Sequence, residues 1–144
     1  MISADTNLFL YSANPACPQH VSAKAFFDAL PKQGFVVCEL VLIEIYMQLR
    51  NPAVLRRPFS AKVAAGFCDQ LRSNPNWQWI DYHADVSKKL WHWASTTGSG
   101  FRRIIDARLA FTLLHHGVTE FATANVTEFK SFQFDKVWNP VSHP

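Results

Sequence analysis

The sequence predicts an α/β domain built on a mainly parallel sheet. Short segments rich in β-branched and aromatic residues alternate with longer segments whose apolar residues recur at helical spacing, and proline, glycine or asparagine separates many of them. Strands that alternate with helices favour a parallel sheet, because parallel strands need a crossover between them. With 144 residues, 49% of them hydrophobic, the chain is large enough for a buried core. We expect one domain over residues 1–144.

The expected strands are short and number four or five. In chain order they are Ile2–Ala4, Phe35–Cys38, Trp77–Ile80, Thr119–Thr123 and, as a candidate fifth, Asp135–Trp138. The expected helices are His20–Leu30, Glu39–Arg50, Ser60–Arg72, Asp81–Trp93 and Ile104–His116. Pro31, Asn51-Pro52 and Gly117 end three of these helices. Between Asn7 and Pro15 we expect only a helical turn and a loop.

Composition narrows the functional classes. The net charge of +3 is weakly basic, which permits a polyanionic partner without requiring one. Cys17, Cys38 and Cys68 are odd in number and scattered, so we expect free thiols in a reducing compartment. The chain turns polar directly after Ile2, and its longest apolar stretch is too short for a bilayer. We therefore expect a cytoplasmic location and no membrane association.

Acidic and polar residues follow the predicted strands. Asp5 ends the first strand, and Thr123 and Asn125 close or follow the fourth. Ligands bind at this carboxyl edge in open α/β sheets. Glu44 lies within an apolar helix, and Asp106 near the start of another. A buried carboxylate without a partner costs several kcal/mol, on the order of 5.

Converging carboxylates raise one another's pKa, and a divalent cation removes that repulsion. Oxygen ligands suit Mg²⁺ or Mn²⁺, which can activate water and stabilise charge on a phosphodiester. Each residue also has a simpler interpretation. Asp5 and Asn125 could be turn residues, Asp5 a helix N-cap, Glu44 a partner of Arg50 or a surface acid, and Asp106 a stabiliser of a helix N-terminus.

Four segments resemble the motifs of PIN-domain ribonucleases, in the same order and across essentially the whole chain. They are Ile2–Tyr11 (ISADTNLFLY), Val41–Tyr46 (VLIEIY) followed by Leu49–Pro52, Ile105–Ala110 (IDARLA) and Phe121–Phe129 (FATANVTEF). Length and motif spacing resemble VapC-type toxins of bacterial toxin–antitoxin pairs. The resemblance implies a PIN-like fold of three layers (α/β/α), in which helices wrap the sheet.

The resemblance also implies a function. Family members cut single-stranded RNA with Mg²⁺ or Mn²⁺, are usually homodimers, and are silenced by a cognate antitoxin whose C-terminal segment lies across the active site. By position, Asp5, Glu44 and Asp106 would bind metal, directly or through water. Asn7 and Thr123 would support the site. Hydrolysis by in-line attack of water is expected to leave a 5′-phosphate.

The last motif departs from its most acidic form. Asn125 is neutral where many relatives have aspartate, and Glu128 stands where a second acid is common. Because affinity for hard cations follows ligand charge, we expect one tight metal, with Asn125 among the catalytic residues and Glu128 in support. Arg102 and Arg103 could receive RNA phosphates at the rim of the site, or form a solvated basic turn.

Other functions remain open at this point. A PIN-like nucleic-acid-binding module with weak or no catalysis, acting through a partner protein, is favoured by the neutral Asn125 and opposed by the intact acids. A phosphatase with Asp5 as nucleophile would usually need a second aspartate where Asn7 stands. A DNA partner is a further alternative.

Overall fold

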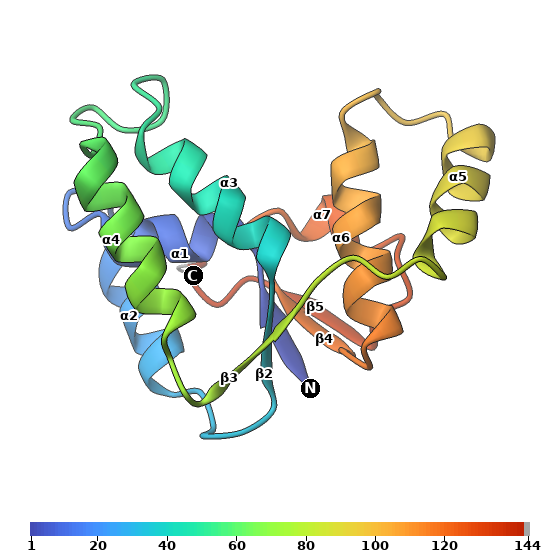
Figure 1. Cartoon of the computed structure of the whole chain (residues 1–144), viewed down its shortest axis with the longest axis horizontal. Coiled ribbons are helices and arrows are strands. Elements are labelled where there is room, and N and C mark those ends of the chain that lie inside the picture. Colours follow the sequence, from blue (N-terminus) through green and yellow to red (C-terminus); the bar gives the residue numbers. More distant parts are fainter. Residues whose placement is uncertain (143–144) are drawn as a thin grey trace.

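The computed structural model describes residues 1–142; His143 and Pro144, the end of the expected domain, lie outside the described residues. Residues 1–142 form a parallel sheet of five strands and seven helices (Figure 1). The strands are β1 (Ile2–Ala4), β2 (Phe35–Cys38), β3 (Trp77–Ile80), β4 (Glu120–Ala122) and β5 (Lys136–Trp138). The helices are α1 (Thr6–Ala13), α2 (His20–Asp28), α3 (Glu39–Leu49), α4 (Ala61–Arg72), α5 (Val86–Thr96), α6 (Arg103–His115) and α7 (Val126–Phe129).

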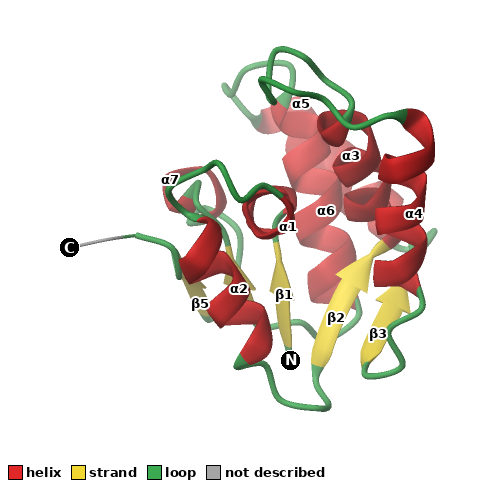
Figure 2. Cartoon of the chain, turned by 90° about the vertical axis from the view of Figure 1, so that its left-hand side faces the viewer, coloured by secondary structure: helices red, strands yellow, loops and turns green. Residues whose placement is uncertain are grey.

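The sheet order is β3-β2-β1-β4-β5, and its pairings are parallel. The first strand of the chain therefore lies at the centre. Helices α2 and α4 lie on one side of the sheet and α5 and α6 on the other (Figures 1 and 2). This confirms the predicted three-layer PIN-like α/β/α arrangement, and the candidate fifth strand is present as β5.

Buried residues explain why the central elements form. All four residues of β2 are buried, as expected for a strand covered on both faces. On the α2 side, the ring of Phe9 lies 4.7 Å from that of Phe27 and 6.0 Å from that of Trp77, centroid to centroid. These contacts fix α1 and α2 against the sheet and so set the direction in which α1 leaves β1.

The prediction for residues 7–15 was wrong in extent. A full helix, α1, occupies Thr6–Ala13, because Leu8 and Phe9 are buried in the core and the Asp5 side chain caps its first turn. Asn14, which suggested a loop, is the residue that ends the helix.

The predicted bounds Asp81–Trp93 were wrong for the fifth helix, which begins and ends later in the chain. Helix α5 runs from Val86 to Thr96, because local hydrogen bonds hold the preceding residues in a loop. The Asp81 carboxylate accepts from the backbone N of Tyr82 at 2.7 Å, and His83 Nδ1 accepts from the backbone N of Asp85 at 3.1 Å. Side chains of this kind compete with helical bonds. Helix α7 was not predicted; it is a single turn that buries Phe129.

No helix among residues 1–142 is long and apolar enough to cross a membrane. Cys17, Cys38 and Cys68 are free thiols, as expected.

Two glycines, one after a helix end and one inside a helix, allow a matched test of backbone conformation. Gly117 follows α6 with φ of +84°, and a Cβ there would lie 3.2 Å from Met1 Cε. Gly66 lies inside α4, where a Cβ would meet nothing within 4 Å. We expect Gly117→Ala to lower the free energy of unfolding by about 1–2 kcal/mol and Gly66→Ala to raise it by about 0.5–1 kcal/mol. Urea denaturation measures both; equal effects of the two substitutions would contradict this account.

Candidate active site

Asp5 lies at the carboxyl end of the central strand and is 9% exposed. Its backbone N donates to the Ala122 carbonyl at 2.9 Å, which ties the end of β1 to β4. Its Oδ1 accepts from the backbone N of Thr6 at 2.8 Å. Asp5 is therefore a helix N-cap, as one simpler interpretation held, and this role fixes its carboxylate at the edge of the sheet.

The second carboxylate oxygen of Asp5 is held by the end of β4. The Thr123 hydroxyl donates to Asp5 Oδ2 at 2.7 Å, and Asn7 Nδ2 donates to the same oxygen at 3.3 Å. Asn7 Oδ1 in turn accepts from the backbone N of Ala124 at 3.3 Å. These bonds orient Asp5 within the site.

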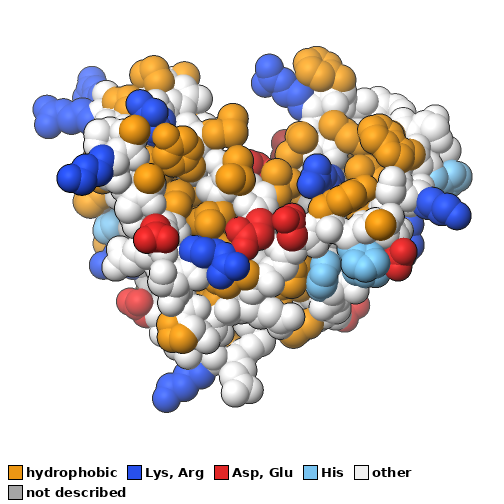
Figure 3. Space-filling model, viewed as in Figure 1, with side chains coloured by type: hydrophobic (Ala, Val, Ile, Leu, Met, Phe, Trp, Pro, Cys, Tyr) orange, Lys and Arg blue, Asp and Glu red, His pale blue; other side chains and the backbone are white. Residues whose placement is uncertain are grey.

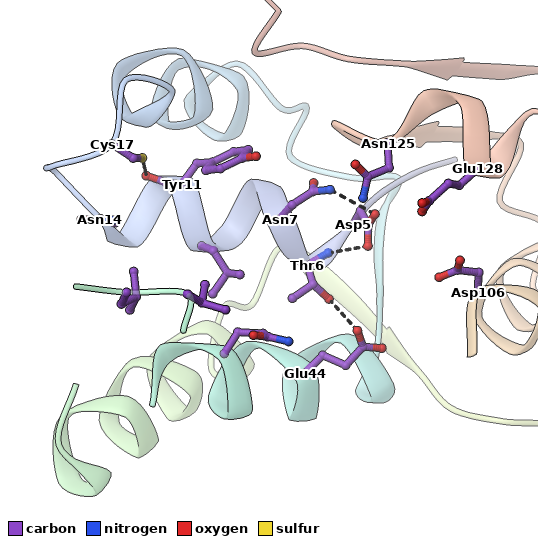
Figure 4. A pocket seen from close by; sticks show the side chains of 14 residues that line it. Asp5, Thr6, Asn7, Tyr11, Asn14, Cys17, Glu44, Asp106, Asn125 and Glu128 are labelled. Atoms are coloured by element: carbon purple, nitrogen blue, oxygen red, sulfur yellow. Dashed lines mark hydrogen bonds between the residues drawn. The ribbon is translucent and has the colours of Figure 1, made fainter. Parts of the chain in front are cut away.

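Glu44, Asp106 and Glu128 reach the same cavity as Asp5 from three helices, α3, α6 and α7 (Figure 4). We call these carboxylates the acid cluster: Asp5, Glu44, Asp106 and Glu128. The cavity has a volume of about 470 Å³. In the space-filling view, acidic side chains gather at the base of the hollow between the two helical sides (Figure 3). Residues distant in sequence thus form one acidic site.

Burial and mutual repulsion disfavour the charged forms of these acids. Burial raises the pKa of Asp5 to about 6; repulsion from Asp106 and Glu128 adds to this, while hydrogen bonds from Thr123 and Thr6 act against it. Burial, followed by repulsion from Asp5 and Asp106, raises the pKa of Glu44 to about 7. The pKa of Asp106 is raised by burial and by Glu128 and lowered by Arg103. The cluster therefore favours either protons or a cation.

Arg103 is turned toward the acid cluster. Its Nε lies 3.5 Å from Asp106 Oδ2, and a terminal nitrogen donates to the Glu128 backbone carbonyl. The guanidinium thus joins the start of α6 to α7. It offsets part of the negative charge near Asp106, and its predicted contact with an RNA phosphate stays a prediction. Arg102 is exposed, and its contact with RNA stays a prediction.

The structure brings together most residues selected from the sequence. Asn7 and Asn125 line the cavity beside the acid cluster, and Thr123 contacts Asp5 beneath it. Glu44 does not pair with Arg50, whose guanidinium instead donates to the Tyr46 hydroxyl at 3.4 Å. The catalytic and metal-binding roles of the residues selected from the sequence remain proposals.

Sequence reasoning missed two features of this cavity. The Thr6 hydroxyl donates to Glu44 Oε2 at 3.5 Å, and a second, less acidic half of the cavity extends along α1. Its lining includes Leu10, Tyr11, Asn14, Gln48, Val54 and Leu55. Leu10 and Tyr11 follow Asn7 by three and four residues, and Asn14 follows them by four and three. This spacing could have revealed the lined face had α1 been predicted.

A separate group of metal-binding residue types lies on the surface. Candidate ligand atoms of His83, Asp85 and His115 fall within 4.8 Å of one another, and all three residues are exposed. The group does not line the acidic cavity.

Solved structures share the fold. VapC20 of Mycobacterium tuberculosis, a toxin described as cleaving the sarcin–ricin loop, matches with a TM-score of 0.66 and 19% identity over 84% of this chain and 87% of its own. VapBC2 of Rickettsia felis, bound to a promoter DNA fragment, matches with a TM-score of 0.67 and 17% identity over 96% and 98%. FitAB bound to a DNA fragment matches with a TM-score of 0.73 and 20% identity over 100% of this chain and 98% of its own. These matches show that the chain has the PIN-like α/β/α fold of these proteins.

Curated relatives show the family to which the chain belongs. Ribonuclease VapC24 from two strains of Mycobacterium tuberculosis, CDC 1551 / Oshkosh and H37Rv, is 45% identical over 143 residues, which span 99% of this chain and 98% of the relative. The chain belongs to the VapC family of ribonucleases. No protein-family model matches it.

The raised pKa values predict how stability depends on pH without metal. A folded-state pKa above the unfolded value means that the folded protein binds the extra proton. The contribution of Glu44 is therefore lost as the pH rises from about 4.5 to about 7. At pH 8 in EDTA we expect Glu44→Gln to raise the free energy of unfolding by about 1–3 kcal/mol. Urea denaturation at pH 8 and pH 4 measures this. A gain that is as large at pH 4 would contradict it.

Proposed function

We propose that the chain is a metal-dependent endoribonuclease that cleaves single-stranded regions of RNA as the toxin of a toxin–antitoxin pair. The observation that carries the proposal is the convergence of Asp5, Glu44 and Asp106 in one cavity at the carboxyl edge of the sheet. The 45% identity to a protein named ribonuclease VapC24 supports RNA as the substrate. The proposal treats residues 1–144 as a single PIN domain.

Asp5, Glu44 and Asp106 would hold Mg²⁺ or Mn²⁺, directly or through water. The donor set fits, because it consists of carboxylate oxygens whose repulsion a divalent cation relieves, and such cations prefer oxygen ligands. Bound there, the cation would supply a water of lowered pKa and neutralise charge on the scissile phosphodiester.

The remaining polar residues position this set. Thr123 and Asn7 hold Asp5 Oδ2, and Thr6 contacts Glu44 Oε2. Glu44 would accept a proton from the attacking water, whose oxygen bonds to phosphorus while the bond from phosphorus to the 3′-oxygen breaks. One product then carries a 5′-phosphate, and the 3′-oxygen leaves and takes up a proton as a hydroxyl. Arg103 limits the negative charge that an approaching RNA phosphate meets.

Exposed apolar side chains support a protein partner. Ile43 and Met47 on α3, and Phe101 and Ile105 at the start of α6, are large and exposed. Ile43, Met47 and Ile105 lie on the two helices that carry Glu44 and Asp106, and Phe101 lies in the turn just before α6. We propose that a cognate antitoxin and a second copy of the chain cover such surfaces, since several matched structures are described as toxin–antitoxin complexes or carry both components. We also propose a cytoplasmic location, where such an RNA substrate and antitoxin would be found.

One feature favours the alternative of a binding module without catalysis. Asn125 supplies no charge at the cavity, so fewer ligands are available there than in the most acidic family pattern. Cleavage assays separate the two functions.

We expect purified protein free of antitoxin to cut a structured-RNA panel with Mg²⁺ or Mn²⁺ and not with EDTA. Asp106→Asn should lower the rate by about 100-fold or more, because loss of a ligand weakens metal binding and phosphate positioning. Asp69→Asn, an exposed α4 residue outside the cavity, is the matched control and should cut normally. Gel analysis of labelled RNA provides the readout. Cutting in EDTA, or products with a 2′,3′-cyclic phosphate, would contradict the mechanism.

Metal stoichiometry tests the role of the neutral residue. We expect calorimetry to show one tight site for Mn²⁺ in the wild-type protein. Asn125→Asp should strengthen a second site by about 10-fold, because cation affinity rises with ligand charge. Two tight sites in the wild-type protein would overturn this expectation.

A further inference from the structure

The cavity that contains the acid cluster continues into a half of different chemistry. We call this half the amide end; it is formed by Leu10, Tyr11, Asn14, Gln48, Val54 and Leu55. In Figure 4, Tyr11 and Asn14 lie toward the opposite end of α1 from Asp5. At a rise of 1.5 Å per residue, Asp5 and Asn14 are about 13 Å apart along the helix. This leaves space beside a phosphate at the acid cluster for one nucleoside.

The orientation of the Asn14 amide is fixed by the backbone. The backbone N of Ala16 donates to Asn14 Oδ1 at 3.1 Å. A backbone N–H can only donate, so the atom facing it must be the amide oxygen. The NH₂ group of Asn14 has no hydrogen-bond partner among the side chains of residues 1–142 and is available to a ligand.

The orientation of Gln48 follows by the same reasoning in two steps. The backbone N of Ala53 donates to Asn51 Oδ1 at 3.0 Å, which leaves the Asn51 NH₂ group to donate. It donates to Gln48 Oε1 at 3.4 Å. The part of Gln48 left for a ligand is again its NH₂ group. The amide end therefore offers hydrogen-bond donors from two sides.

Its other walls suit a flat, apolar group. Leu10, Val54, Leu55 and the ring of Tyr11 supply apolar and aromatic surface. Single-stranded RNA is recognised by contacts of this kind, in which an unstacked base packs on an aromatic ring and bonds through its edge. A neighbouring cavity shares Asn14 and Leu55 and is lined by Arg56 and Arg57. Both arginines are exposed, so a polyanion leaving the amide end would meet positive charge.

We propose that the amide end binds the base next to the scissile phosphate and selects keto bases, guanine or uracil, over adenine and cytosine. Guanine O6 and N7 and the uracil carbonyl oxygens accept hydrogen bonds from the Asn14 and Gln48 NH₂ groups. Adenine and cytosine carry an exocyclic amino group where guanine has O6 and uracil has O4. This amino group would face an amide NH₂ group, so that both donors would stay unpaired. This proposal rests on the proposed ribonuclease function and adds the substrate preference of that site.

Cleavage of a short single-stranded RNA library, randomised around the cut, tests the selection. We expect the wild-type protein to prefer guanine or uracil at one position beside the cut by at least 5-fold. Gln48→Met and Asn14→Ala remove the amide donors without adding charge and should abolish the preference. Gln48→Glu, which presents an acceptor, should shift it toward adenine or cytosine. Gln70→Met, at an exposed position on α4 outside this cavity, should leave it unchanged.

A binding measurement separates this proposal from the nuclease function. Calorimetry with Mg²⁺ and each 5′-nucleoside monophosphate should give several-fold tighter binding of the guanine or uracil nucleotide, and Gln48→Met should remove the difference. Absence of cleavage together with this discrimination would refute the nuclease and leave the base site standing. Cleavage with the same base preference in wild-type and Gln48→Met protein, or equal binding of all four nucleotides, would overturn the base site. A preference for adenine or cytosine in the wild-type protein would do the same.

Discussion

Repulsion among carboxyl groups that share one cavity constrains the structure around the site. Asp5, Glu44 and Asp106 reach this cavity from separate parts of the chain, and burial raises the pKa of each. The fold must therefore hold them together against an electrostatic cost. Core packing of β1, α3 and α6 supplies the stability, since Ala4, Ile45 and Ala107, each within one residue of an acid, are fully buried. A bound cation would relieve this cost and so couple the fold to the proposed chemistry.

The parallel sheet explains why these groups converge. Asp5 follows the central strand, and Thr123 follows its neighbour β4, so both lie at the same edge and bond to each other. Helices α3 and α6 bring Glu44 and Asp106 toward that edge from either side. Arg103 then joins α6 to α7 through Asp106 and the Glu128 carbonyl. The proposed nuclease site is thus built from a strand end and the helices α3 and α6, and it would be completed by a divalent cation.

Much of this arrangement could be predicted from the sequence, because it depends on local patterns. The apolar run Phe35–Cys38 is a strand with the expected bounds. Acids embedded among aliphatic residues pointed to the cavity that Asp5, Glu44 and Asp106 share. The misplaced start of α5 and the missed α7 depended on side-chain bonds and on burial of Phe129, which pattern alone does not reveal. The position of Arg103 depends on tertiary contacts with α7. The NH₂ groups of Asn14 and Gln48 are free because partners two or three residues away hold the amide oxygens.

The central claim is that a divalent cation replaces protons in the acid cluster, and proton release on metal binding tests it most directly. Calorimetric titration of Mn²⁺ in two buffers of different ionisation enthalpy gives the number of protons released. With Asp5 at a pKa of about 6 and Glu44 at about 7, we predict release of about one proton or more near pH 6 and almost none at pH 9. Asp106→Asn should weaken the binding itself. Tight binding without proton release at pH 6, or binding unchanged in Asp106→Asn, would contradict the account.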